Sequence, residues 1–178
     1  ITGGSSGIGL AIAKALVDAG SKVAITGRDR ARVTAAAKAI NAHAIAADVS
    51  SEEDVTRTYR EFFEKFGHLD ILVNSAGFGL RAPLVEMSRA RFDAVFQTNV
   101  TGTMLMSREA ARHFIERKSG NLIHLGSTAA LRGAPNGTAY YASKFAGRGM
   151  TECWRTELRQ HNVRVFLVNP SEVLTNFA

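Results

Sequence analysis

The sequence has little of several residues that mark particular classes of protein. Its single cysteine, Cys153, excludes a disulfide framework and favours a reducing compartment, so we expect a cytoplasmic protein. Only 3 of the 178 residues are proline, which excludes a proline-rich linker. The apolar runs are too short to span a bilayer and no signal peptide is visible, so we expect no membrane partner.

Charge of one sign is not clustered anywhere in the chain. Lys and Arg number 22 against 16 Asp and Glu, for a net charge of +6, but no Lys/Arg-rich block occurs. We therefore expect no nucleic-acid partner, and only a mild attraction for anionic ligands. The 5 histidines lack the spacing of metal ligands, so no metal site is expected.

What the chain does contain is a regular alternation of apolar strands and helical segments, with 46% hydrophobic residues to fill a core. Strands are predicted at 21–29, 43–50, 68–77, 120–127 and 163–170, and helices at 8–19, 31–42, 52–66, 88–118 (with a break near Gly102) and 140–160. This order predicts an α/β fold: a Rossmann-type, doubly wound parallel sheet with helices on both faces, in three layers.

We expect one NAD(P)-binding domain over residues 1–178. The chain opens at Ile1, in what reads as the last residue of a strand, and stops at Ala178, where a loop and more secondary structure are expected. The start of the first strand and a C-terminal region containing the substrate loop and last strand are therefore expected to be missing.

A glycine-rich loop lies between that first strand and the first predicted helix. Gly3, Gly7 and Gly9 form Gly-x-x-x-Gly-x-Gly, which departs from the Gly-x-Gly-x-x-Gly fingerprint. The physical function carries over, because glycines permit a tight turn and a helix amino end offers N–H groups to a pyrophosphate. The alternative is a glycine-rich turn that binds no ligand.

The end of the second strand bears on the choice between the two nicotinamide cofactors. In dinucleotide-binding folds an acid at this point pairs with the ribose 2′-hydroxyl, whereas an arginine suits a 2′-phosphate. Arg28 follows Gly27 with no acid before it, so NADP(H) is favoured and NAD(H) stays possible. The alternatives are that Asp29 reaches the ribose instead, and that Arg28 is a solvated turn residue.

Polar or small residues also follow the third and fourth strands. Asp48 could accept a hydrogen bond from an adenine amino group, or could be an ordinary turn aspartate. Asn74, Ala76 and Gly77 would let a flat ring lie against the backbone. Asn99 stands in a predicted helix among apolar residues, where it is either a satisfied core amide or a group that holds water beneath an active site.

The clearest chemical pattern is formed by Ser127, Tyr140 and Lys144. Tyr140 and Lys144 lie one helical turn apart and share a helix face, while Ser127 ends an apolar strand. A nearby cation favours the phenolate, so we expect Lys144 to lower the pKa of Tyr140 and let it exchange protons near neutral pH. Taken alone, the tyrosine and lysine could equally be an ordinary surface pair.

In their order and spacing, these motifs resemble the short-chain dehydrogenase/reductase family, in its single-domain branch, and are similar to 3-oxoacyl-carrier-protein reductases. The resemblance implies hydride transfer between a nicotinamide and a carbonyl or secondary alcohol, with Tyr140 rather than Tyr141 as general acid/base. It implies the catalytic residues Asn99, Ser127, Tyr140 and Lys144, and the cofactor-binding residues Gly3, Ser5, Ser6, Gly7, Ile8, Gly9, Arg28, Asp48, Val49, Asn74, Ala76, Gly77, Tyr140, Lys144 and Pro170.

The resemblance also implies individual roles. Ser127 would hydrogen-bond the substrate oxygen, Lys144 would hold the nicotinamide ribose, and Asn99 would position a water that relays protons to Lys144. Two residues depart from the family pattern: Ser75 replaces an asparagine, and Ser171 replaces a glycine whose conformational freedom would be lost at that turn. Expected partners are a small carbonyl or alcohol substrate, which could be linked to acyl-carrier protein, and further copies of the chain in a homotetramer or homodimer.

A second function of a different class fits the same fold. A non-catalytic NAD(P)-binding protein that senses redox state would keep the glycine loop, but such proteins typically lose the tyrosine or the lysine. Both Tyr140 and Lys144 are present, so the sequence favours the enzyme.

Overall fold

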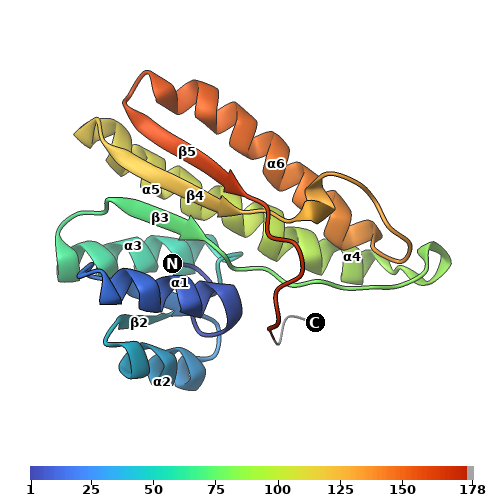
Figure 1. The fold of residues 1–178 in the computed structure, drawn as a ribbon, viewed down its shortest axis with the longest axis horizontal. Helices are drawn as coiled ribbons and strands as arrows, with labels where there is room; N and C mark the ends of the chain where they lie inside the picture. Colours follow the sequence, from blue (N-terminus) through green and yellow to red (C-terminus); the bar gives the residue numbers. More distant parts are fainter. Residues whose placement is uncertain (176–178) are drawn as a thin grey trace.

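The computed structural model describes residues 1–175, which form an α/β fold with all strands parallel (Figure 1). The strands are β1 (Ala24–Gly27), β2 (His43–Ala46), β3 (Ile71–Asn74), β4 (Gly120–Leu125) and β5 (Val163–Val168). The α-helices are α1 (Gly7–Asp18), α2 (Arg30–Ile40), α3 (Glu52–Phe66), α4 (Arg89–Phe96), α5 (Thr103–Arg117) and α6 (Thr138–Arg159).

The first residues of the chain join the strands into one sheet. β1 pairs with β2, and β4 lies between β3 and β5. Between β1 and β3, Thr26 N donates to Ile1 O, Thr2 N donates to Val73 O, and Thr2 bridges to Asn74 in parallel. The sheet therefore runs β2, β1, residues 1–4, β3, β4, β5, which confirms the predicted doubly wound order and the strand at Ile1.

Helices cover both faces of this sheet, as predicted. On one face, α1 and α2 enclose an apolar cluster that includes Ala13, Ile25 and Val33, each 0% exposed. On the other face, α3, α5 and α6 pack on the rest of the sheet, with α4 extending from the amino end of α5 (Figure 1). None of the helices within residues 1–175 is both long and apolar enough to cross a bilayer.

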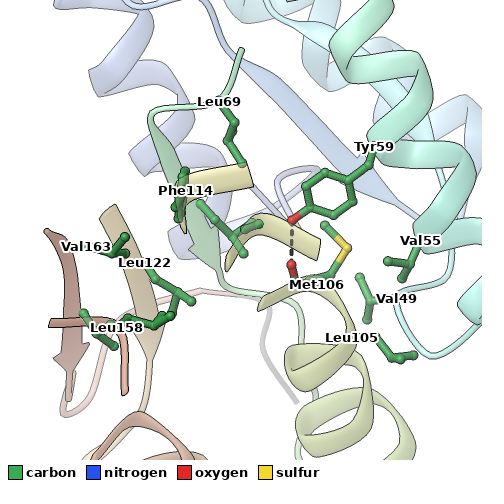
Figure 2. Packing of buried hydrophobic residues seen from close by; sticks show 13 residues of the cluster. Val49, Val55, Tyr59, Leu69, Leu105, Met106, Phe114, Leu122, Leu158 and Val163 are labelled. Carbon is green, nitrogen blue, oxygen red and sulfur yellow. Dashed lines mark hydrogen bonds between the residues drawn. The ribbon is translucent and has the colours of Figure 1, made fainter. Parts of the chain in front are cut away.

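The larger core lies between the sheet and α3, α5 and α6 (Figure 2). Phe114 of α5 is 0% exposed and packs there with Leu122 of β4. Tyr59 reaches into the same core from α3, and its hydroxyl donates to the carbonyl oxygen of Met106 at 2.6 Å, as Figure 2 shows. That bond satisfies the one polar atom of a buried aromatic side chain, so α3 is fixed against α5.

The predicted helix over 88–118 has no break at Gly102, which corrects that expectation. Instead, α4 continues through a π-helical segment, Gln97–Gly102, directly into α5. Gly102 is required for a packing reason, because a Cβ there would lie 2.6 Å from Cγ2 of Val49. Two short 3₁₀ helices that were not predicted, Leu84–Glu86 and Thr128–Ala130, stand in the loops after β3 and β4.

Candidate active site

A cleft of about 470 Å³ opens at the carboxyl ends of the strands. The predicted residues that line it are Gly3, Ser5, Ser6, Gly7, Ile8, Gly9, Arg28, Asp48, Val49, Ala76, Gly77, Ser127, Tyr140, Lys144 and Pro170. Asn74 and Asn99 are buried, 2% and 3% exposed, behind the residues that form its wall. The fold thus brings segments far apart in the sequence to one elongated site.

The glycine loop needs glycine for two physical reasons. Gly3 and Gly7 have φ of +63° and +53°, in the left-handed region that favours glycine. A Cβ on Gly9 would lie 2.5 Å from the carbonyl oxygen of Gly3. Ser6, at the N-cap of α1, makes no side-chain capping bond, so it does not cap the first N–H groups of this 12-residue helix, whose amino end lines the cleft.

The opposite rim of the loop carries two exposed arginines, Arg28 and Arg32, and neither forms an ion pair within residues 1–175. Asp29 Oδ1 caps α2 by accepting from Arg32 N at 3.0 Å. Asp48 Oδ1 accepts from both the amide and the hydroxyl of Ser50. Both carboxylates therefore serve the local backbone or a neighbouring hydroxyl.

The loop after β3 is held in place by a residue whose role was not predicted. Thr2 is 2% exposed, and its Oγ1 accepts from the amides of Ser75 and Ala76, each at 3.0 Å. Because Thr2 itself lies in the sheet, this pair of bonds fixes the wall of the cleft to the start of the glycine loop. The threonine directly before the first glycine was the available signal.

Asn99 lies in the π-helical segment with its side-chain amide fully engaged. Oδ1 accepts from Phe78 N, while Nδ2 donates to Phe78 O and to Ser143 Oγ, all at 3.0 Å. Ser143 Oγ in turn donates to Tyr140 O at 2.7 Å. The amide is thus a satisfied core group that ties the loop after β3 to α6. Its side chain has no N–H left for a water.

Ser143 is a second residue that the sequence reading missed. It is 1% exposed and joins Asn99 to the backbone of Tyr140. A polar residue on the buried face of a helix, between Tyr140 and Lys144, was the signal that could have identified it.

Ser127, Tyr140 and Lys144 all line the cleft and lie close together. Ser127 follows β4, its amide donates to Asn169 Oδ1 at 3.1 Å, and its side chain hydrogen-bonds Tyr140. Lys144 is 9% exposed, and its Nζ donates to Leu125 O at 2.9 Å. The same Nζ lies over the Tyr140 ring, 5.7 Å from its centroid. Tyr140 and Lys144 are therefore no ordinary surface pair.

The expected effect of Lys144 on the tyrosine is wrong for this structure. Burial raises the pKa of Tyr140 above its ordinary value, against the lowering effect of the hydrogen bond with Ser127. Burial also lowers the pKa of Lys144 to about 8, because the charged ammonium is less well solvated inside the protein than in water. Desolvation is the largest influence on the pKa of both groups. At neutral pH the phenol is protonated and Lys144 is largely charged.

Ser75, which lies within the predicted segment 74–77, also lines the cleft, and further residues complete the lining beyond those predicted, among them Thr26, Gly27, Arg32, Ala47, Phe78, Thr98, Leu125, Gly126, Ser171, Val173 and Thr175. Most adjoin a predicted residue at a strand end, and that position was their only signal. Ser171 is not among the residues of 1–175 with positive φ, so the turn does not need the glycine it replaces. No group of His, Cys, Asp and Glu within the described residues could hold a metal ion.

Comparisons with known proteins agree with this geometry. The family model described as short chain dehydrogenase matches residues 1–178. An uncharacterized oxidoreductase of Staphylococcus saprophyticus is 36% identical, over 98% of this chain and 77% of the relative. The sorbitol dehydrogenase of Cereibacter sphaeroides is 37% identical, over 97% of this chain and 69% of the relative.

A solved structure extends the likeness to three dimensions. The 3-ketoacyl-(acyl-carrier-protein) reductase from Brucella melitensis, complexed with NADH, is 35% identical, with a TM-score of 0.96 over 99% of this chain and 75% of that one. Proteins of this family bind a nicotinamide cofactor and act on alcohol or ketone groups. The chain belongs to the short-chain dehydrogenase family of oxidoreductases.

Proposed function

We propose that this protein is an NADP(H)-dependent carbonyl reductase of the 3-oxoacyl-carrier-protein reductase type, with Ser127, Tyr140, Lys144 and Asn99 in its active site. One observation carries the proposal. Ser127, Tyr140 and Lys144 line the same cleft as the glycine loop and Arg28. A proton donor and a dinucleotide cradle thus share one continuous space.

The residues of the cleft fit a nicotinamide dinucleotide. The glycine loop and the amino end of α1 would hold the pyrophosphate, with Ser5, Ser6 and Ile8 around it. Asp48 and Val49 would flank the adenine, and Asn74, Ala76, Gly77 and Pro170 would border the nicotinamide half of the cleft. When bound, the cofactor supplies or accepts the hydride of the reaction.

The charges at the adenosine end favour the phosphorylated cofactor. Arg28 and Arg32 stand together on the rim without carboxylate partners among residues 1–175, whereas Asp29 is used as a helix cap. A guanidinium fork recognises a phosphate by paired hydrogen bonds. Binding of the ribose 2′-phosphate is therefore assigned to Arg28, with Arg32 beside it.

The protonation states suit reduction of a carbonyl. Because the pKa of Tyr140 is raised, its phenol is a proton donor at neutral pH and delivers the proton that the reduced oxygen requires. Ser127, which adjoins that hydroxyl, donates a hydrogen bond to the same substrate oxygen and orients it. Lys144 holds the nicotinamide ribose. Asn99 acts through Ser143 by fixing the backbone of Tyr140.

The proposal also covers the location, assembly and substrate of the enzyme. We infer a cytoplasmic enzyme in which residues 1–178 form one NAD(P)-binding domain. It would assemble as a homodimer or homotetramer and reduce a small carbonyl compound, including one carried on acyl-carrier protein. The net charge of +6 is compatible with an acidic carrier.

A panel of carbonyl substrates tests the proposal. The protein is incubated with 3-oxoacyl thioesters, keto sugars and small ketones, each with NADPH and with NADH, and cofactor oxidation is followed by absorbance. We expect turnover of at least one 3-oxoacyl thioester, with higher kcat/KM for NADPH than for NADH. Turnover of keto sugars alone would contradict the proposed 3-oxoacyl substrate class. A preference for NADH would contradict the assignment of Arg28 to the 2′-phosphate.

A further inference from the structure

Directly behind Lys144 lies a buried histidine that the proposed chemistry does not use. His124 of β4 is 3% exposed and immediately precedes Leu125, whose carbonyl oxygen accepts from Lys144 Nζ. Its ring fits beneath Gly147 of α6, where an added Cβ would lie only 2.4 Å from Nε2. Gly147 and Lys144 are three residues apart in α6, so they share the helix face that meets the ring.

The polar atoms of this ring have no partner in the protein. Within residues 1–175, neither Nδ1 nor Nε2 of His124 forms a hydrogen bond, and the same holds for Oδ1 of Asn74. Asn74 and His124 are register partners in neighbouring parallel strands, so their side chains leave the sheet on the same face. Asn74 Nδ2 donates to Ser107 of α5, which places it on the face covered by α5 and α6.

These atoms make the interior beside Lys144 polar. The charged or titratable groups near the ammonium are Tyr140 on its own helix and His124 on β4, while β3 and α5 present Asn74 and Ser107, which do not titrate. The described residues place no carboxylate among the hydrogen-bond partners of Lys144. Acceptor atoms of neutral groups are therefore what this interior offers to a buried ammonium.

The neutral form of His124 is suited to that task. Burial and the charge of Lys144 together lower the pKa of the ring to about 4, so it stays uncharged at neutral pH. Because no hydrogen bond fixes its tautomer, the ring proton can occupy the nitrogen farther from Lys144. The other nitrogen then carries a lone pair, and an electron-rich atom in this interior offsets part of the desolvation of Lys144.

We propose that His124 is a positioning residue for Lys144: its neutral ring sets the spacing between β4 and α6 and presents an acceptor nitrogen to the buried ammonium. The functional part of this inference rests on the proposed function, in which Lys144 holds the cofactor ribose. His124 is not among the described residues that line the cleft, so it would act through Lys144.

Substitution of His124 tests the proposal through the pH dependence of NADPH binding. In the full chain, His124→Leu removes the acceptors, and His124→Asn keeps a polar group; NADPH fluorescence gives Kd from pH 6 to pH 9. We expect His124→Leu to move the alkaline loss of binding to lower pH by about one unit, so that affinity falls roughly fivefold near pH 8, roughly tenfold near pH 9 and little at pH 6. His124→Asn should restore most of it.

Two results would overturn the proposal. A His124→Leu profile with the wild-type shape, or one weakened equally at every pH, would show that the ring is only packing. Ring-nitrogen chemical shifts of the ¹⁵N-histidine-labelled wild-type protein need neither a variant nor the cofactor. They should report a neutral His124 from pH 6 to pH 9, and a ring charged at pH 7 would refute the proposal by itself. Failure of the wild type to bind NADPH would instead refute the proposed function.

Discussion

The Nζ of Lys144 lies over the ring of Tyr140, 5.7 Å from its centroid, and is anchored to the carbonyl oxygen of Leu125. This placement gives the lysine a fixed position near the phenol without making it a direct partner of the hydroxyl. Burial therefore dominates both pKa values, raising that of Tyr140 and lowering that of Lys144. The protein presents a proton donor, and the phenolate has to be generated by the reaction or stabilised by the bound cofactor.

Arg28→Ala should change the choice between cofactors. Removal of the guanidinium deletes a charge-assisted contact with the 2′-phosphate, so Kd for NADPH should rise roughly tenfold or more, while Kd for NADH changes little. Fluorescence titration with both cofactors measures this. Arg30→Ala is the matched control, because Arg30 begins α2 but does not line the cleft. Equal losses for NADPH and NADH would remove Arg28 from the phosphate site.

Gly147→Ala should destabilise the protein by about 1–3 kcal/mol, because the new methyl group would overlap Nε2 of His124. Denaturant unfolding measures the change. Gly149→Ala is the control two residues along α6: nothing lies within 4 Å of a Cβ there, so alanine should be neutral or slightly stabilising. Adding His124→Ala to Gly147→Ala should recover much of the loss. No recovery would mean that the clash lies elsewhere.

Mild acid should destabilise the fold through His124. The unfolded chain binds a proton at this ring below about pH 6.5, whereas the folded chain does so only near pH 4. Stability attributable to the neutral ring is thus complete above pH 6.5 and is lost as the pH falls toward 4, by an amount on the order of 3 kcal/mol.

The measurement is the free energy of unfolding against pH for the wild type and for His124→Asn. His113, whose pKa burial also lowers, acts in the same direction, so the contribution of His124 is the difference between the two curves. Parallel curves between pH 6.5 and pH 4 would contradict this account.

Much of the fold could be predicted because its signals are local. Apolar runs such as 120–127 and the glycine after α1 mark element ends, and strict alternation of strand and helix favours a parallel, doubly wound sheet. The π-helical segment at Gln97–Gly102 could not be predicted, since it depends on the approach of Val49 to Gly102 and on the bonds of Asn99 to Phe78 and Ser143.

In the active site, too, local features could be predicted and features that depend on packing could not. Ser127, Tyr140 and Lys144 were identifiable from residue type and spacing, and the structure brings them together. The pKa values of Tyr140 and Lys144 could not be predicted, because desolvation depends on how α6 packs on β4. The spacing of residues in the sequence does not reveal this packing. Residues that act through others, such as Thr2, stay hidden for the same reason, as their partners are distant in the sequence.

The most direct test of the central claim is Tyr140→Phe, measured for both turnover and cofactor binding. This change removes the hydroxyl and keeps the ring over Lys144, so Kd for NADPH should stay within about threefold of the wild type. The rate of carbonyl reduction should fall by roughly 10²–10⁴-fold, the usual contribution of a positioned proton donor. Wild-type turnover in this variant would contradict the account and place the proton transfer elsewhere.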